Sequence, residues 1–275
     1  MFIGWLKFGD VATITKIAEE VGWLVDGYHL KLMMMHSPHL CYGAYYDGQL
    51  IGAIMAIEFE HTAQIKYFMM KPTYQKQGYG KRLFETLLGA LKSDYQSVYL
   101  HVNPSLVPFF EQYGFEAKTE VGRFLNVGKV PPFNFTNAHA KELDGDNFEN
   151  VISKIDFETF GENRMDFLLD EMERNSSLKF TQPNGFQHSS VVNARSVYLG
   201  PWQVRAGHKE EAEKMMRGVL YFRGLKKVFA DVPMINDKAV ELFKKYHFEK
   251  KVGFVHMCLG STCDVKFENI YAFSL

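Results

Sequence analysis

The sequence is poor in cysteine, and this limits both its redox chemistry and its metal chemistry. Its three cysteines, Cys41, Cys258 and Cys263, are too few and too irregular for a disulfide framework. We therefore expect reduced thiols and a cytoplasmic location. Cys258 and Cys263 lack the accompanying Cys or His residues that hold zinc, so we expect no metal site.

Neither sign of charge is in excess, and no long apolar run is present. Lys and Arg total 31, Asp and Glu total 32, and the formal net charge is −1. Such a chain lacks the positive field that nucleic-acid binding requires. No apolar run approaches the ~20 residues of a membrane span, and Met1–Lys7 does not resemble a secretory signal. We expect neither a nucleic-acid partner nor a membrane partner.

The remaining composition is that of a folded protein with a substantial core. Hydrophobic residues make up 47% and charged residues 23% of the 275 residues. That composition excludes a disordered chain. The length suits one large domain or two small ones.

Hydrophobic periodicity in the first half predicts an α/β domain. Apolar residues at helical spacing alternate with short runs rich in β-branched and aromatic residues. Helices are expected over residues 10–21, 28–35, 81–91 and 108–113, and strands over 40–46, 50–59, 64–70, 97–102 and 115–121. Asp47-Gly48 predicts a hairpin turn between the first two strands.

A weak repeat divides the chain. Residues 112–116 recur as 245–249, an offset that also matches Asn103 with Asn236, while Pro72 and Gly78 match Pro201 and Gly207. The order of elements is the same in both halves. We place the boundary in the Pro-containing stretch 129–132, which gives domains 1–130 and 131–275.

The segment Gln75-Lys76-Gln77-Gly78-Tyr79-Gly80 carries the clearest chemical signal. It joins a predicted strand to a predicted amphipathic helix. A helix N-terminus presents unpaired amide donors and a partial positive charge. Glycine allows close backbone approach and positive φ. The pattern is typical of a pyrophosphate cradle, although it matches neither the Rossmann fingerprint nor the P-loop.

In its context this segment resembles the GNAT superfamily of acetyl-CoA-dependent N-acyltransferases. Residues 68–80 are similar to that family's fourth strand and pyrophosphate loop, with its Gln/Arg-x-x-Gly-x-Gly core met by Gln75, Gly78 and Gly80. Asn103 and residues 109–115 resemble its fifth-strand Asn and its closing box. The resemblance covers nearly the whole chain and includes a two-lobed branch. It implies two tandem lobes, each a mixed, mostly antiparallel twisted sheet flanked by helices.

The resemblance also implies how acetyl-CoA is held. The backbone of Phe68, Met69 and Met70 would pair with the pantetheine arm, and Asn103 would touch the pantetheine or its thiol end. The pyrophosphate would lie on the loop amides. Together with Gln75, the residues of that loop are Lys76, Gln77, Gly78, Tyr79, Gly80 and Lys81.

The catalytic groups are less clear. Many family members place a Tyr acid in the closing box, where this chain has Phe110 and, in the second half, Phe243. A base is also needed, because the attacking amine must be neutral. His101, two residues before Asn103 on the same strand face, and Glu58 are the candidates. On the fourth strand the matching face carries Gln64 and Lys66, which we assign to substrate contacts.

The second half departs from the cofactor motif. Its corresponding loop, residues 203–208, lacks the second Gly and the initial Gln, and His247 replaces Gly114. We expect a degenerate lobe of structural importance that binds no second cofactor.

These observations predict a cytoplasmic acetyltransferase. It would move an acetyl group from acetyl-CoA, as co-substrate, to a primary amine of a small molecule by direct attack, as a monomer or homodimer. Two alternatives stay open. One is a non-catalytic acyl-CoA-binding protein, and the other is a protein N-acetyltransferase. The acceptor itself is not predicted, since acceptor loops vary independently of the scaffold.

Overall fold

The computed structural model divides the protein into two compact units. The first contains residues 1–101 together with Cys258–Cys263, and the second contains Val102–Met257 and Asp264–Leu275. The structure describes residues 1–23, 25–91, 95–126, 145–174, 176–223, 226–260 and 265–274. The predicted linker 129–132 lies outside the described residues.

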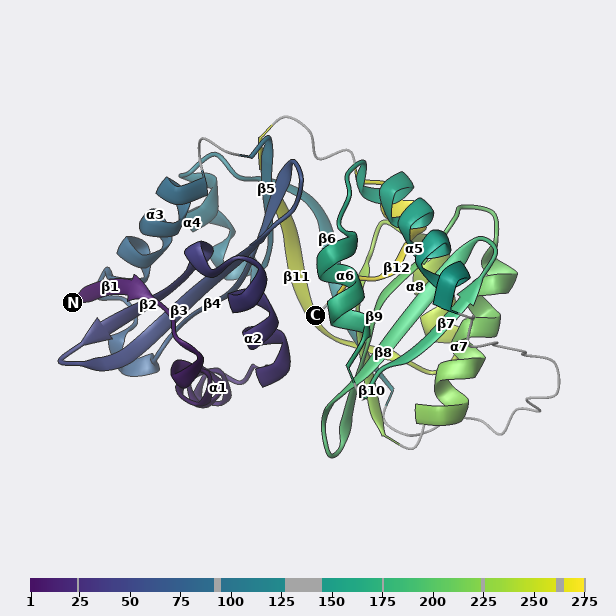
Figure 1. Cartoon of the computed structure of the whole chain (residues 1–275), viewed down its shortest axis with the longest axis horizontal. Coiled ribbons are helices and arrows are strands. Elements are labelled where there is room, and N and C mark those ends of the chain that lie inside the picture. Colours follow the sequence, from purple (N-terminus) through teal and green to yellow (C-terminus); the bar gives the residue numbers. More distant parts are fainter. Residues whose placement is uncertain are drawn as a thin grey trace. The chain divides into compact units, whose positions relative to one another are not determined.

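The first unit is built on a mixed sheet in the order β1-β2-β3-β4-β5 (Figure 1). Its strands are β1 (Phe2–Trp5), β2 (Cys41–Tyr46), β3 (Gln49–Glu58), β4 (Thr62–Met70) and β5 (Ser97–Val102). Neighbouring strands are antiparallel except for β4 and β5, which are parallel. Asp47 and Gly48 form the predicted hairpin turn, and both have positive φ. The short strand β1 was not predicted.

Helices cover both faces of this sheet (Figure 1). α1 (Val11–Glu20) and α2 (Gly27–His36) lie on one side and α3 (Tyr79–Leu91) lies on the other. The side chain of Asp26 caps α2 by accepting the amide of Tyr28 at 3.0 Å. The buried helix residues are mainly aliphatic, as their spacing predicts, and α3 buries Leu83, Phe84, Leu87, Leu88 and Leu91.

The second unit repeats this plan with strands in the order β11-β6-β10-β9-β8-β7. The strands are β6 (Glu116–Asn126), β7 (Leu178–Gln182), β8 (Gly185–Asn193), β9 (Ser196–Val204), β10 (Lys227–Pro233) and β11 (Glu249–Gly260), and a short β12 (Ile270–Ala272) lies beside β9. The helices are α4 (Val107–Glu111), α5 (Gly145–Phe160), α6 (Met165–Met172), α7 (Lys209–Arg223) and α8 (Asp237–Lys245). α7 and α8 share one apolar core with the sheet, and α5 and α6 share another.

The closing strand of the first half of the sequence belongs to the second unit. β6 was expected to close the first half, but it pairs antiparallel with β10 in the second unit, from Val121 opposite Pro233 to Asn126 opposite Val228. The end of β11 belongs to the first unit, where the backbone of Gly260 lies against Ser97. The second unit therefore contains a whole strand from the first half of the sequence, whereas the first unit takes only the last residues of β11.

The internal repeat is structural, with one correction. Gly78 and Gly207 both have positive φ before a helix, and Asn103 and Asn236 both cap one. Pro201 does not correspond to Pro72, because it lies inside β9 after a cis peptide bond whereas Pro72 follows β4.

The expectation that all three cysteines are reduced thiols is wrong for one of them. Cys258 is disulfide-bonded in the structure, so it is not a reduced thiol. Cys41 is free and buried, and burial raises its pKa to about 12. Cys263 lies outside the described residues. No helix in the described ranges is long and apolar enough to cross a membrane.

The repeat generates a stability prediction at His247. Gly114 and His247 occupy equivalent turns with φ of 90° and 61°, a region that disfavours a side chain by about 1–2 kcal/mol. After the greater entropy of an unfolded Gly is subtracted, His247→Gly should stabilise the protein by roughly 0.5–1 kcal/mol. Chemical denaturation measures this difference. His247→Ala keeps a Cβ and should bring no such gain; equal gains from both variants would contradict the explanation.

Candidate functional site

The loop between β4 and α3 is fixed at both ends. The amide of Lys71 donates to Ile51 O at 2.8 Å, where β4 ends. The side-chain amide of Gln75 then donates to Met70 O at 3.0 Å, which ties the loop back to the strand. A short 3₁₀ turn over Pro72–Tyr74 fills the interval. The Gln that the sequence motif singles out therefore holds the loop in shape.

Beyond Gln75 the backbone takes a shape that suits an anion. Lys76 and Gly78 both adopt left-handed φ, 59° and 81°, an arrangement that turns successive amides outward. The first hydrogen bond of α3 runs from Arg82 N to Gly78 O at 3.2 Å. The amides of the preceding first turn therefore have no acceptor within the helix.

The charge of the neighbouring side chains agrees with that geometry. Lys71, Lys76, Lys81 and Arg82 all belong to the loop or to the first turn of α3 and add positive charge to the helix dipole. A Cβ at Gly80 would lie 3.4 Å from Met70 and 3.5 Å from Phe68. These are ordinary van der Waals contacts with side chains of β4, so it is the outward amides and the positive charge of this segment that suit a pyrophosphate.

The strand that leads into this loop separates from its neighbour. β4 and β5 pair from Thr62 opposite Ser97 to Ile65 opposite Leu100, and the parallel pairing ends there. The register of β3 with β4 also shifts at this point, and Tyr67 is in the left-handed region with φ of 54°. These features define a β-bulge. Beyond the bulge Met69 and Met70 stay paired with Ala53 and Gly52 of β3, while the parallel pairing of β4 with β5 has ended at Ile65.

Polar side chains gather on the α1–α2 face at the bulge. Alternate β3 residues share a face, and their β4 partners share it with them. The pairs are Ala53–Met69, Met55–Lys66 and Ile57–Gln64. Tyr99 pairs with Gln64, and His101 follows two residues later on the same face. The structure thus brings Gln64, Lys66 and His101 to one face of two adjacent strands.

A further pair on this face was not predicted from the sequence. Tyr67 Oη lies 2.6 Å from Nδ1 of His29 on α2, and both residues are buried. Phe68, the next residue, points the other way and packs against Phe84 of α3. The sequence does place a histidine, His29, among the apolar residues of a predicted helix. Its partner could not be found from the sequence, because the bulge changes which β4 residues lie on each face of the sheet.

Glu58, the other candidate base, lies at the far end of the sheet from the loop. It pairs with Ala63, four residues before Tyr67, which is about 13 Å along a strand. Its carboxylate accepts a hydrogen bond from the hydroxyl of Tyr95 and lies 3.5 Å from Nε2 of His39. Its carboxylate is therefore held by two side chains at the end of the sheet away from the loop.

In the second unit the corresponding strands separate in the same way. β9 and β10 pair in parallel only from Ser196 to Tyr198 of β9. The register of β8 with β9 then shifts around Gly200-Pro201. His188 supports this bulge: its Nδ1 lies 3.0 Å from Gly200 O, and burial lowers its pKa to about 3. The neutral ring therefore donates to the Gly200 carbonyl.

The end of the chain fills the space that this separation creates. β12 pairs antiparallel with β9, with Ile270 opposite Gln203, and the amide of Phe273 donates to Asp231 O of β10 at 2.9 Å. Asn269 Oδ1 accepts the amide of Ala206, in the loop before α7, at 3.0 Å. This tail, residues 267–273, therefore lies between β9 and β10, and its Asn269 side chain accepts a hydrogen bond from a loop amide.

Asn236 holds the tail in place. Its Nδ2 donates to the carbonyls of Phe267, Glu268 and Ile270, at 3.3, 2.9 and 2.9 Å. Its Oδ1 caps α8 by accepting the amide of Ala239. Asn236 thus binds the backbone carbonyl groups of an extended segment of the chain.

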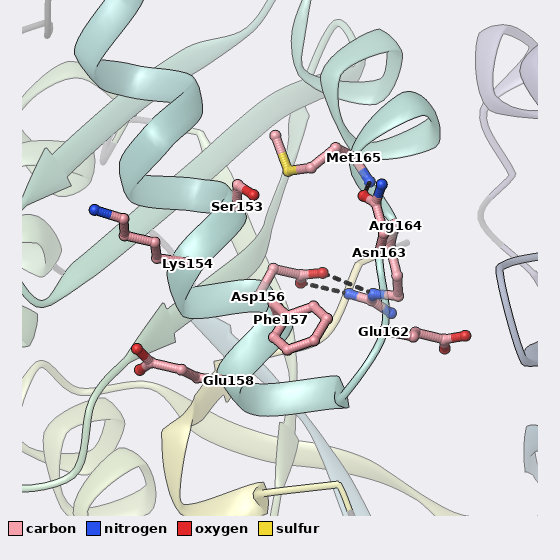
Figure 2. A pocket seen from close by; sticks show the side chains of 9 residues that line it. All are labelled: Ser153, Lys154, Asp156, Phe157, Glu158, Glu162, Asn163, Arg164 and Met165. Carbon is pink, nitrogen blue, oxygen red and sulfur yellow. Dashed lines mark hydrogen bonds and ion pairs between the residues drawn. The ribbon is translucent and has the colours of Figure 1, made fainter.

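A separate pocket of about 250 Å³ lies at the turn from α5 to α6 (Figure 2). Arg164 donates to both carboxylate oxygens of Asp156 at 2.9 and 2.7 Å, and its guanidinium stacks on Phe160. Glu158 is paired with Arg205. None of the residues predicted as site residues lines this pocket, and the carboxylates of Asp156 and Glu158 are neutralised by their arginine partners.

Comparison with known proteins identifies the fold. Two family profiles described as "Acetyltransferase (GNAT) domain" match residues 24–131 and 152–272. The chain belongs to the GNAT acetyltransferase family. It is therefore an acyltransferase with two GNAT lobes, as the sequence motif predicted, and no curated protein matches it closely enough to add a more specific activity.

Solved GNAT structures share the fold over nearly the whole chain. A candidate acetyltransferase from Pyrococcus horikoshii has a TM-score of 0.83 at 18% identity, covering 100% of this chain and 94% of its own. A tandem GNAT protein from the clavulanic acid biosynthesis pathway has a TM-score of 0.65 at 13% identity, covering 95% and 99%. A GCN5-related N-acetyltransferase from Sphaerobacter thermophilus has a TM-score of 0.64 at 14% identity, covering 96% of this chain and 98% of its own.

Two residues of the GNAT motif lie in the second unit. Asn103 Oδ1 accepts the amide and the hydroxyl of Ser105 at 3.0 and 2.8 Å, so its oxygen caps the following turn. Phe110 is 1% exposed and packs against Phe109 and Phe115. A phenyl ring in this packing has no proton to donate. The described residues contain no cluster of metal-ligating side chains.

The cradle predicts a charge-sensitive binding site. Gly80→Asp would add a negative charge to the first turn of α3, beside the amides expected to hold a pyrophosphate, and should weaken CoA binding roughly tenfold or more. Calorimetry with CoA measures this loss. Gly89→Asp is the matched control, because it adds the same charge to the same helix at a position where an added Cβ would have no atom within 4 Å. Equal affinity of a folded Gly80→Asp variant and the wild type would overturn the assignment.

Proposed function

We propose that this GNAT protein transfers an acetyl group from acetyl-CoA to the primary amine of a small molecule by direct attack in a ternary complex. The observation that carries the proposal is the continuity of the first unit's site. An anion cradle at residues 76–81 leads directly into the strand edge 68–70, which ends at a bulge bordered by polar side chains.

Acetyl-CoA fits this arrangement from one end to the other. The amides of residues 76–81 would hold the pyrophosphate. The backbone of Phe68, Met69 and Met70 would pair with the amides of the pantetheine arm. When bound, the cofactor supplies an activated thioester, whose acyl carbon would lie near the bulge.

The second unit supports this assignment by analogy within the same chain. There the tail runs from the loop before α7 towards the bulge, as the pantetheine arm would in the first unit. Asn236 donates to its backbone carbonyls. Asn103, the equivalent residue, would donate to the pantetheine amides in the same way. The tail also leaves no room for a second cofactor, so one CoA should bind per chain.

The acceptor would lie on the α1–α2 face. Gln64 offers an amide there and Lys66 a positive charge, which suits an acceptor with an anionic or carbonyl group beside its amine. The amine must be neutral to attack. His101 on the same face could accept its proton directly, whereas Glu58 would need a chain of water molecules across about 13 Å.

One observation favours a second candidate, a non-catalytic acyl-CoA-binding protein. Phe110 replaces the family's acid and is fully packed. A thiolate is a weak enough base to leave without an acid, since thiols titrate near pH 8.5, so this replacement does not prevent turnover. A protein acceptor remains the other alternative.

The proposed reaction predicts amine-dependent release of CoA thiol. Wild-type protein with acetyl-CoA should release thiol faster with at least one member of a panel of small primary amines than without an amine. Mass spectrometry should find the acetylated amine. Gly80→Asp, with its weakened cofactor binding, should be slower at subsaturating acetyl-CoA. Tight CoA binding without amine-dependent release would establish the non-catalytic alternative, and release only with peptides would establish a protein acceptor.

The two equivalent asparagines provide a matched pair of variants. Asn236→Ala removes a helix cap and three bonds to the tail, and should lower the free energy of unfolding by about 2–4 kcal/mol. Asn103→Ala should instead weaken CoA binding while changing stability by about 1 kcal/mol, the value of its cap. Denaturation and calorimetry distinguish them, and calorimetry should give one site per chain in both folded variants. Two sites of similar affinity in the wild type would refute the role given to the tail.

A further inference from the structure

Three tyrosine side chains form a cluster beside the anion cradle. Tyr46 ends β2, Tyr74 ends the 3₁₀ turn after β4, and Tyr79 is the first residue of α3. The ring centroids lie 5.7 Å apart for Tyr46 and Tyr74, 6.1 Å for Tyr46 and Tyr79, and 6.2 Å for Tyr74 and Tyr79. Tyr46 is 43% exposed and the other two are half-buried. The tyrosine cluster therefore lies at the surface of the first unit and not in its core.

The rings do not cover one another. Their planes are tilted by 47°, 43° and 46° in the three pairs, so no ring lies flat on its neighbour. An aromatic face left in this way can stack with a further planar group. In the sequence Asp47 follows Tyr46, and Lys76 lies between the other two tyrosines, so charges of both signs are close. A neutral planar group suits the cluster best.

The cluster lies where the nucleotide end of CoA would leave the cradle. The amide of Tyr79 belongs to the cradle residues 76–81, which would hold the pyrophosphate. In CoA the pantetheine arm leaves one phosphate, which the strand edge 68–70 would receive, and adenosine leaves the other. Only a ribose separates the pyrophosphate from the adenine ring. Adenine is a neutral planar group of the kind that stacks on aromatic side chains.

The second unit, whose loop binds the tail of the chain, lacks all three tyrosines. The residue after its equivalent glycine is His208, where the first unit has Tyr79. Its corresponding hairpin joins β7 to β8, and β7 ends in Gln182 where β2 ends in Tyr46. Only four residues separate β9 from α7, so the turn 72–74 has no counterpart. The cluster is thus found only beside the loop that would bind a nucleotide.

Holding the hairpin to the loop does not require aromatic rings. In the second unit the amide of Arg205 donates to Asn184 O at 2.8 Å. Its guanidinium donates to Pro183 O and Asn184 Oδ1, both at 3.3 Å. One residue therefore joins the equivalent hairpin and loop by hydrogen bonds. A need to join these segments does not account for three partly exposed tyrosines.

We propose that the tyrosine cluster binds the adenine ring of CoA by stacking, and that it makes the nucleotide end of the cofactor a determinant of affinity. This inference rests on the proposed function, because it requires CoA in the cradle. It adds to the site Tyr46 and Tyr74, which the sequence motif does not mark, and gives the ring of Tyr79 a task beyond that of its amide.

Calorimetry with two ligands tests the proposal. Wild-type protein should bind CoA more tightly than 4′-phosphopantetheine, which lacks adenosine. Tyr46→Leu removes the ring but keeps an apolar side chain, and should weaken CoA binding roughly 5–100-fold, the value of one base–aromatic contact. The Kd of 4′-phosphopantetheine should not change. Tyr46→Phe keeps the ring and should bind CoA as the wild type does.

A matched control distinguishes stacking from a general effect of losing a tyrosine. Tyr28 is 42% exposed and lies in the first turn of α2, on the other side of the sheet from α3. Tyr28→Leu should leave the Kd of CoA unchanged. An equal loss of affinity for both ligands in Tyr46→Leu would overturn the proposal, because the ring would then only hold the loop in shape. So would equal affinities of the wild type for the two ligands.

Proton NMR gives a direct measurement. In CoA-saturated wild type, H2 or H8 of adenine should show NOEs to tyrosine ring protons, and these should weaken in Tyr46→Leu. Their absence from the saturated wild type would overturn the proposal. Neither measurement uses turnover, so a failure to acetylate amines cannot be mistaken for any of these results. A wild type that binds no CoA would refute the proposed function, and this inference with it.

Discussion

The organisation of both units depends on one constraint: a sheet that opens in its interior must find new partners for the exposed backbone. Buried amide and carbonyl groups without partners cost too much to be left alone. In both units the parallel pairing of two central strands stops after three or four residues. Beyond that point a strand edge needs hydrogen-bonding groups from elsewhere. The two units meet this need differently, and that difference divides their roles.

In the second unit the chain meets the need itself. Residues 267–273 supply carbonyls to Asn236, an amide to β10 and a side-chain oxygen to the loop before α7. In the first unit the groups in question belong to β4 and to a loop whose conformation suits a phosphate-bearing ligand. A linear molecule that alternates amides with methylene groups and ends in a pyrophosphate, as in the proposed cofactor, would satisfy both.

Much of this organisation could be predicted from the sequence, because the signals are local. The loop is marked by Gln75, Gly78 and Gly80, and the structure gives the first two separate physical tasks: Gln75 anchors the loop to β4 and Gly78 makes a left-handed turn. The repeat was visible because turns and caps need particular residues at particular positions. The family and the two-lobed α/β fold are confirmed on this basis.

What escaped prediction depends on contacts between distant residues. The bond between His29 and Tyr67 crosses from a helix to a strand and requires a bulge that no sequence pattern marks. Pro201 was matched to the wrong place because composition cannot distinguish a proline inside a strand from one after it. The tail beside β9 could not be foreseen either, since three residues, Ile270–Ala272, are too few to show an alternating pattern.

The pairing of β6 with β10 has a consequence for biosynthesis. β6 leaves the ribosome about a hundred residues before β10, its partner in the second unit, and residues 258–260 of the first unit follow later still. The early product of synthesis is thus a partial sheet with an unsatisfied edge, the kind of surface that invites aggregation. A cut between the two homologous halves would separate β6 from β10, the strand with which it pairs in the second unit.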